Sequence, residues 1–189
     1  FAHNFWYGLS VNIPGYGTEN IHKLSQGTVL PNDGLNYKLS AKNNWRISCL
    51  SSLKNGLGEG FIVHLPDGVK YYFDWMVTRR VKDLVTPYSP IRRHEVFIFA
   101  TKAVDRFGGT ITYHYDASNK MRITEIEASD GASIKINYDE AGRISTASTG
   151  SQVWQYTYDV NPSNGYSSLK EVILPDQSRW TYEGPVYVR

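Results

Sequence analysis

The sequence predicts an all-β protein built from antiparallel hairpin repeats, with little or no helix. Aromatic residues make up 14% of the 189 residues, and 14 tyrosines occur with 16 glycines, a composition that suits pleated strands joined by turns. Apolar and polar residues alternate over several short segments, which is the period of a β-strand. A phrase ending in Tyr-Asp or Tyr-Glu returns at intervals of 20 to 24 residues, which indicates repeated units.

Charge and composition limit the classes of partner. The chain has 20 basic and 18 acidic residues and a net charge of +2, which gives no argument for nucleic acid as a partner. No apolar run approaches the ~20 residues of a membrane helix, so we expect no membrane span. A single cysteine, Cys49, excludes an internal disulfide framework and leaves the compartment open. Because the chain starts at Phe1 and ends in the strand-like "PVYVR", we expect a fragment of a larger protein.

The chain is expected to form one continuous unit with two parts. Residues 1–60 are predicted as an irregular β segment that precedes the repeats, since "LPNDGLNYKL" and "LKNGLGEGFIV" place Asn, Asp and Gly between alternating segments. Residues 61–189 are predicted as hairpin repeats. Here "LPDGVKYYFD" at 65–74 matches "LPDQSRWTYE" at 174–183 without a gap.

A basic segment interrupts the repeats at about 78–95. Its sequence, "TRRVKDLVTPYSPIRRHE", contains two prolines that cannot continue a strand ladder, which predicts an exposed loop joining two hairpins. The loop could contact an anion or a glycan through Arg79, Arg80, Arg92 and Arg93. A solvated connection without a ligand is the default interpretation of such a segment.

The repeated phrase is predicted to end a strand and to start a turn. Gly142 in "YDEAGRI" aligns with Asn119 in "YDASNKM", which predicts a positive φ at that position, and Arg143 aligns with Lys120. The aspartate is expected to accept hydrogen bonds from N–H groups of the turn. The residues assigned to the structural repeat are Tyr113, Tyr115, Asp116, Asn119, Tyr138, Asp139, Gly142, Arg143, Tyr156, Tyr158, Asp159, Tyr182 and Glu183.

No residue pattern predicts catalysis, a cofactor or a metal. The five histidines lack the spacing of a zinc motif, and Cys49 has no nucleophile context in "WRISCLSS". The segment "DVNPSNG" at 159–165 resembles the start of a calcium loop, but its glycine comes one place late and Lys170 stands where a bidentate Glu belongs. An enzyme centred on Cys49 or a histidine is the least favoured interpretation.

These phrases resemble the Rhs or YD-repeat family, whose unit reads aromatic, variable, Tyr-Asp, two variable residues, Gly-Arg-Leu. The best copy is "INYDEAGRIS", followed by "YHYDASNKMR" and by "YTYDVNPSNGYSSLK", which has an enlarged turn. The segments "VDRFGGTITYHYD" and "GEGFIVHLPDGVKYYFD" are also similar to the family, and "FWYGLSVNIPG" resembles the segment that precedes its repeats. The resemblance covers about 61–183 well and 1–60 loosely.

The resemblance implies a long, curved and twisted antiparallel sheet that forms part of a shell or spiral. In bacterial polymorphic toxins and insecticidal toxin complexes such shells enclose a C-terminal toxic domain, and in teneurins a related shell supports recognition at the cell surface. It implies a non-catalytic, secreted or cell-envelope segment whose partners are other repeats and an enclosed or presented domain of the same polypeptide. The family's self-cleaving aspartate element has no counterpart in this sequence. The alternative is a module that binds cell-surface carbohydrate through exposed aromatic residues and the basic segment.

Overall fold

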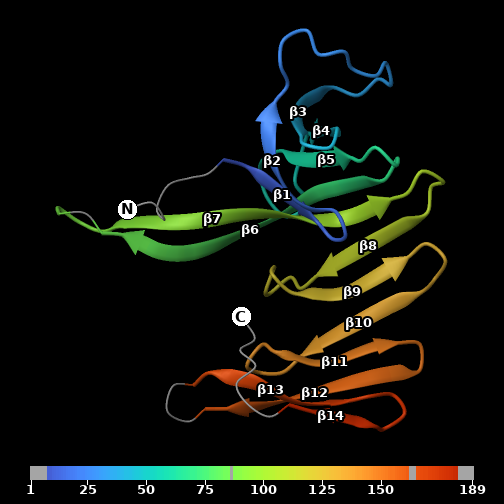
Figure 1. The fold of residues 1–189 in the computed structure, drawn as a ribbon. Coiled ribbons are helices and arrows are strands. Elements are labelled where there is room, and N and C mark those ends of the chain that lie inside the picture. Colours follow the sequence, from blue (N-terminus) through green and yellow to red (C-terminus); the bar gives the residue numbers. More distant parts are fainter. Residues whose placement is uncertain (1–7, 86, 162–164, 183–189) are drawn as a thin grey trace. The chain divides into compact units, whose positions relative to one another are not determined.

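The computed structural model describes residues 8–85, 87–161 and 165–182, and these residues form an all-β fold without a helix (Figure 1). Fourteen strands are described, each antiparallel to its sheet neighbours, and they follow one another across the sheet in the order of the sequence. The predicted fold class is therefore confirmed. The chain divides into two compact units, residues 1–111 and 112–189, and each is described separately.

The first unit contains seven complete strands. They are β1 (Ser10–Ile13), β2 (Gly17–Lys23), β3 (Tyr37–Ala41), β4 (Trp45–Leu50), β5 (Gly60–His64), β6 (Lys70–Leu84) and β7 (Ile91–Val104). Strand β8 (Thr110–Tyr115) crosses the boundary between the units. The change in sequence character at residue 60 does not coincide with a division between the compact units, because residues 8–60 belong to the same unit as β6 and β7.

Residues 8–60 supply most of the buried core of the first unit. Ile13 in β1 and Ile47 in β4 are completely buried, and Trp45 and Val63 are almost so. These side chains belong to one cluster, so β1 packs its apolar side chains against β4 and β5 and supplies a second layer. This part of the chain is more regular than its sequence predicts.

A long hairpin replaces the loop predicted at 78–95. Strands β6 and β7 pair from Lys70 opposite Val104 to Leu84 opposite Ile91, and only residues 85–90 lie outside them. Pro87 and Pro90 lie in this connection, where no ladder N–H is required. The prediction failed because the charged residues 78–83 and 92–95 occupy an exposed two-stranded ribbon, which tolerates polar side chains on both faces.

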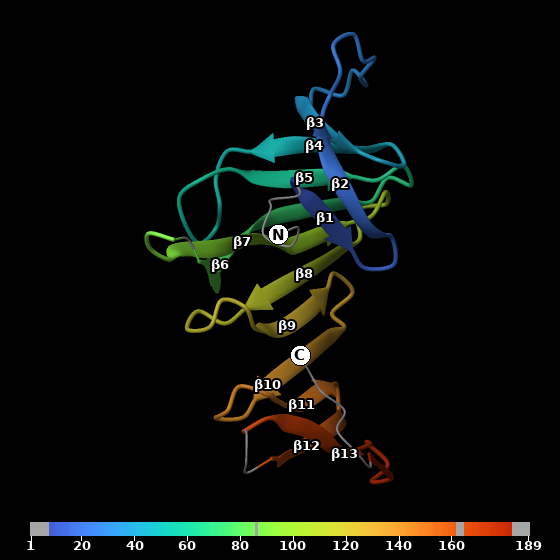
Figure 2. The same ribbon diagram turned by 60° about the vertical axis from the view of Figure 1, so that its left-hand side comes forward.

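The second unit contains the remaining strands, which form one layer. They are β9 (Ile123–Ala128), β10 (Ser133–Tyr138), β11 (Ile144–Thr149), β12 (Gln152–Val160), β13 (Ser167–Ile173) and β14 (Arg179–Thr181). Among the described residues of this unit, Val172 is the only buried hydrophobic residue. The layer is visible along the lower part of the ribbon in Figure 2.

The two faces of this layer differ in chemistry. Cross-strand partners share a face, so the register places on one face Ile126, Ile134, Ile136, Ala147, Trp154, Tyr156, Val172 and Trp180. The opposite face is mainly polar and carries Glu125, Lys135, Asn137, Thr146, Ser148, Gln155, Thr157 and Glu171, with Val153 and Ile173 as apolar members. The alternation seen in the sequence therefore produces an amphipathic sheet with one apolar face.

Three hairpin turns share one geometry. In each turn a carboxylate oxygen accepts the N–H two residues later, at 2.9–3.0 Å. The residue after the aspartate has a positive φ, as in a three-residue hairpin loop with a G1 bulge. The carboxylates belong to Asp67, Asp130 and Asp176.

Replacing Gln177 with glycine is expected to stabilise the second unit by about 0.5–1 kcal/mol. Gln177 has a φ of 67° where the equivalent turns have Gly68 and Gly131, and a side chain costs free energy in this region. Urea denaturation measures the change. Gly131→Ala is the matched reverse substitution, because nothing lies within 4 Å of the added Cβ. Equal stabilities for Gln177→Gly and the unmodified chain would contradict the expectation.

Candidate functional site

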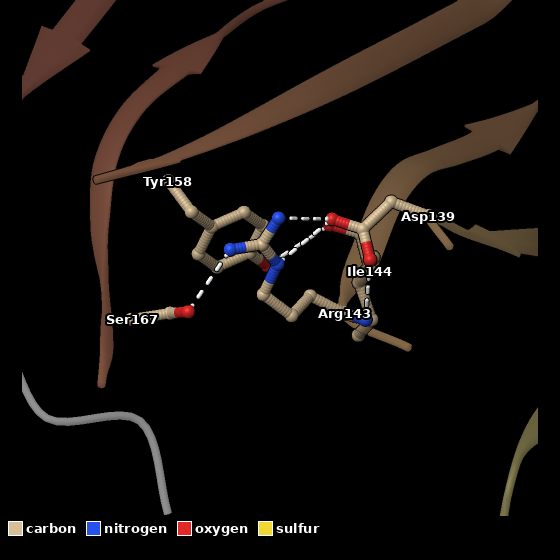
Figure 3. Close-up of polar contacts among 5 residues, drawn as sticks. All are labelled: Asp139, Arg143, Ile144, Tyr158 and Ser167. Atoms are coloured by element: carbon tan, nitrogen blue, oxygen red, sulfur yellow. Dashed lines mark hydrogen bonds and ion pairs between the residues drawn. The ribbon is translucent and has the colours of Figure 1, made fainter. Parts of the chain in front are cut away.

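The candidate site is the contact through which one repeat of the second unit holds the next (Figure 3). Asp139 follows β10, and its carboxylate accepts hydrogen bonds from the backbone N–H and the Nε of Arg143, both at 2.8 Å. The Arg143 Nη2 lies 2.7 Å from the same carboxylate. These backbone and side-chain hydrogen bonds lower the pKa of Asp139 below its usual value. The carboxylate therefore closes the turn and fixes the arginine.

The Arg143 side chain then reaches two later strands. Its guanidinium lies over the ring of Tyr158 in β12, 4.8 Å from the centroid, and its Nη1 donates to Ser167 Oγ in β13 at 2.9 Å. The Tyr158 hydroxyl donates to the carbonyl of Ile144 at 2.9 Å. Burial raises the pKa of Tyr158, which keeps the hydroxyl protonated as a donor.

The preceding repeat makes the same contact. The Arg122 guanidinium lies 5.0 Å from the ring centroid of Tyr138, and the Tyr138 hydroxyl donates to the carbonyl of Ile123 at 2.9 Å. The backbone N–H of Asp116 donates to the Arg122 carbonyl at 2.9 Å, as that of Asp139 does to Arg143 at 2.8 Å. We call this arrangement the repeat contact. In it, an arginine packs on a tyrosine of the next repeat, and the tyrosine hydroxyl donates to the carbonyl of the isoleucine that follows the arginine.

A sheet irregularity accompanies each repeat contact. The register between β10 and β11 shifts at Tyr138, and the register between β12 and β13 shifts at Tyr158. A β-bulge bends a strand locally and redirects its side chains. The bulges therefore occur at the tyrosine that receives the arginine of the preceding repeat.

The predicted alignment of the two turns is wrong by two residues. Arg143 corresponds in structure to Arg122 and not to Lys120, because the first turn is longer by two residues. Gly142 has the predicted positive φ of 84°, whereas Asn119 is not among the residues with positive φ. The Arg-Ile pair present in both repeats is the sequence signal that identifies the correct alignment.

The turn role predicted for the aspartates is confirmed at two of the four phrases. The Asp116 carboxylate accepts the N–H groups of Ser118 and Asn119, which lowers its pKa. Asp159 instead lies inside β12 and forms an ion pair with Lys170 at 3.0 Å, with both side chains mostly exposed. Glu183 lies outside the described residues. Asp159 is the penultimate residue of β12, so the third phrase also lies at the end of a strand.

The other repeat tyrosines lie in the sheet or directly next to it. Tyr156 shares the apolar face with Val172, and Tyr113 and Tyr115 are half-buried on β8. Tyr182 follows β14, and its backbone N–H donates to the Lys170 carbonyl at 2.9 Å. Tyr138 and Tyr158 therefore make the repeat contact, and Tyr156 contributes to the apolar face of the sheet.

Asp74, which ends the matching phrase of the first unit, lies within a strand and not in a turn. It is buried in β6, where it accepts a hydrogen bond from Thr101 Oγ1 at 2.6 Å. The Lys54 Nζ lies 3.7 Å from the other carboxylate oxygen. Local sequence gives no signal for this network, because the three residues come from distant segments.

The four arginines predicted as an anion site do not form one site. Cross-strand pairing places Arg80 opposite His94 on one face of the ribbon and Arg79 opposite Glu95 on the other. Arg79 forms an ion pair with Glu95 at 2.7 Å, and Arg80 forms one with Asp83 at 3.0 Å. Arg93 donates to the Lys82 carbonyl. Arg92 is exposed near the end of the hairpin.

A buried polar pair that the sequence does not predict joins β4 to β5. Ser48 Oγ lies 3.0 Å from His64 Nε2, and Ser48 is 3% exposed. The spacing suits a nucleophile and a base, but the burial of both residues removes them from substrate. Cys49 is the neighbour of Ser48 in β4, so its side chain points to the opposite face of the strand. The pair is therefore best explained as a hydrogen bond inside the core.

Acidification is expected to destabilise the first unit through His64. Burial and the charge of Lys70 lower the pKa of His64, and Asp33 opposes them weakly. The unfolded chain then binds a proton near pH 6.5 that the folded chain does not bind, so stability falls as the pH falls below about 6.5. Urea denaturation between pH 7 and pH 5 measures the decline. His64→Gln should flatten this decline, whereas His94→Gln, an exposed control, should retain it.

No protein-family model matches the chain, and no curated protein is significantly similar to it.

Within residues 8–85, 87–161 and 165–182, no group of three or more His, Cys, Asp or Glu side chains could hold a metal ion. Part of the calcium-like segment at 159–165 lies outside these ranges. In the same described part of the chain, no helix has the length and hydrophobicity to cross a membrane.

Proposed function

We propose that the chain is a non-catalytic structural segment of an Rhs or YD-repeat protein, forming part of a β shell that encloses, delivers or presents a toxin-like C-terminal domain. The observation that carries this proposal is the repeat contact. It occurs twice, through Arg122 with Tyr138 and through Arg143 with Tyr158. Its residues belong to the phrases that resemble the family.

The repeat contact joins each hairpin repeat to the next repeat along the chain. Each arginine leaves its own turn and packs on the tyrosine of the following repeat. Contacts between nearest neighbours are what stabilise solenoid and other repeat proteins, in which no repeat buries enough apolar area alone. A segment built in this way is suited to extending a surface over many repeats.

The amphipathic layer of the second unit could form part of a shell wall, with one face against an enclosed polypeptide and the other against water. One face presents the aliphatic and aromatic residues from Ile126 to Trp180, and the other is mainly polar. Ile134 and Trp180 on the apolar face are 45% and 62% exposed, which leaves apolar area for a further polypeptide. The proposed partners are other repeats and an enclosed or presented domain of the same polypeptide, in a secreted or cell-envelope protein.

Limited proteolysis of the full-length polypeptide tests the enclosure. The double variant Arg122→Gln, Arg143→Gln removes both cation contacts and should accelerate cleavage of the enclosed domain. Lys135→Gln on the polar face is the control, because its ion pair with Glu125 is long, at 3.8 Å, and the lysine side chain is mostly exposed. Equal cleavage rates for the unmodified chain, the double variant and the isolated domain would contradict enclosure.

Carbohydrate binding is the second candidate, favoured by the exposed ring of Trp180. A sugar could stack on this ring. The separation of Arg79 and Arg80 onto opposite faces weakens the version that uses the basic segment. A glycan array with the unmodified chain and Trp180→Ala tests it, and an array without signal for the unmodified chain contradicts it.

A further inference from the structure

The outer half of the β6–β7 hairpin is a two-stranded ribbon that extends beyond its supporting strands. Strand β5 pairs with β6 only between Lys70 and Phe73, whereas β6 and β7 remain paired as far as Leu84 opposite Ile91. Both ribbon views show this part reaching beyond β1–β5 (Figures 1 and 2). We call residues 77–97 the distal hairpin. An unsupported two-stranded hairpin is marginally stable in water. Because the distal hairpin adds little to the core, we look for its role in an interaction with a partner.

The end of the distal hairpin is apolar and exposed. Val85 is 80% exposed, Tyr88 97% and Ile91 52%. Exposed apolar residues that occur singly need no explanation, but a group of them at the end of a projection indicates an interaction site. Tyrosine in particular is favoured where one end of a side chain is apolar and the other contacts water.

Basic residues surround this apolar end. The distal hairpin has five Lys or Arg residues against Asp83 and Glu95, so its net positive charge exceeds the +2 of the whole chain. The two carboxylates are engaged by Arg79 and Arg80. The cations nearest the apolar end are Lys82 and Arg92, both exposed.

The positions of these cations on the two faces of the ribbon indicate how an anionic partner would approach it. Arg79 and Arg93 share one face of the ribbon, and Arg80 and Arg92 lie on the other. A glycan, a peptide or a nucleic acid lying along the ribbon would meet the cations of one face only. A layer that receives the hairpin end-on would meet the cations of both faces, with the apolar residues entering deepest.

We propose that the distal hairpin docks end-on on an anionic lipid surface. Val85, Tyr88 and Ile91 enter the interfacial layer, and Lys82 and Arg92 contact the phosphate headgroups. Peripheral binding of this kind needs an apolar anchor and a basic patch together, because either one alone is marginal. The proposal is independent of the enclosure function and requires no membrane span.

Vesicle sedimentation of the full chain tests the proposal. The chain should sediment with phosphatidylcholine vesicles that contain phosphatidylserine, should not sediment with phosphatidylcholine alone, and should be released by salt. Val85→Ser with Tyr88→Ser should abolish sedimentation. Lys82→Gln with Arg92→Gln should weaken it by roughly fivefold for each cation removed.

Matched controls lie in the same unit. Leu57→Ser removes an apolar side chain that is 96% exposed elsewhere, and Lys23→Gln with Lys42→Gln removes two exposed cations elsewhere. Both should sediment like the unmodified chain, and circular dichroism should be unchanged in all variants. The proposal fails if the unmodified chain ignores phosphatidylserine at low ionic strength or if the Val85, Tyr88 variant binds normally. It also fails if polyglutamate or duplex DNA binds the chain more tightly than vesicles do and that binding survives loss of the apolar end.

Discussion

Replacing Trp45 with alanine is expected to lower the free energy of unfolding of the first unit by about 3–5 kcal/mol. Trp45 is 2% exposed and packs in the cluster that contains Ile13 and Ile47. Its ring also lies 6.3 Å from that of Tyr16 in an edge-on arrangement. Alanine would leave a cavity in a cluster formed by residues of β1, β3, β4 and β5, which closely packed side chains cannot fill by a small shift.

Urea denaturation followed by circular dichroism measures this loss, and the chain contains its own control. Trp180→Ala removes the same side chain from a position that is 62% exposed, where the expected change is within about 0.5 kcal/mol. Similar losses for the two variants would show that the burial of Trp45 does not determine the stability of the first unit.

Replacing Asp74 with alanine is expected to cost about 2 kcal/mol, because Asp74 is a buried charged acceptor. Its carboxylate accepts the Thr101 hydroxyl at 2.6 Å, and Lys54 Nζ donates to the same hydroxyl oxygen at 2.6 Å. Asp74 is 7% exposed and Thr101 3%. The substitution therefore leaves a buried hydroxyl proton without its acceptor.

Two companion variants separate this loss from a general effect of removing a charge. Asp74→Ala combined with Thr101→Val should recover part of the stability, because removing both partners leaves no buried donor unsatisfied. Asp159→Ala removes an exposed carboxylate from its ion pair with Lys170, and the expected cost is below about 1 kcal/mol. If the double variant is as unstable as the sum of the two single variants, the hydrogen bond is not the cause.

Strands could be predicted from the sequence wherever one face of the sheet is apolar. In β10 the alternation of Ile134, Ile136 and Tyr138 predicts both the strand and its apolar face. The outer parts of β6 and β7 could not be predicted in this way, because neither of their faces is apolar throughout. Residues 78–83 are mostly charged because that ribbon has no core to face, so their hydrophobic period is weak.

The repeat contact could be predicted only in part. The aspartate turns at Asp116 and Asp139 follow from local hydrogen bonding, which acts over a few residues. The partner of Arg143 is 15 residues away and depends on strand register and on the bulge at Tyr158. Likewise, Ser48 meets His64 only because β4 pairs with β5. Long-range register, and not propensity, determines these pairs.

The unequal lengths of the two turns have a consequence for how such proteins diversify. The turn from Asp116 to Arg122 is two residues longer than the turn from Asp139 to Arg143 in the following repeat. The arginine nevertheless contacts the tyrosine of the next repeat in both cases. The number of residues between the aspartate and the arginine can therefore differ between repeats while the repeat contact is retained. New binding specificities could arise there at little structural cost, and homologous repeats are best aligned on the Arg-Ile pair.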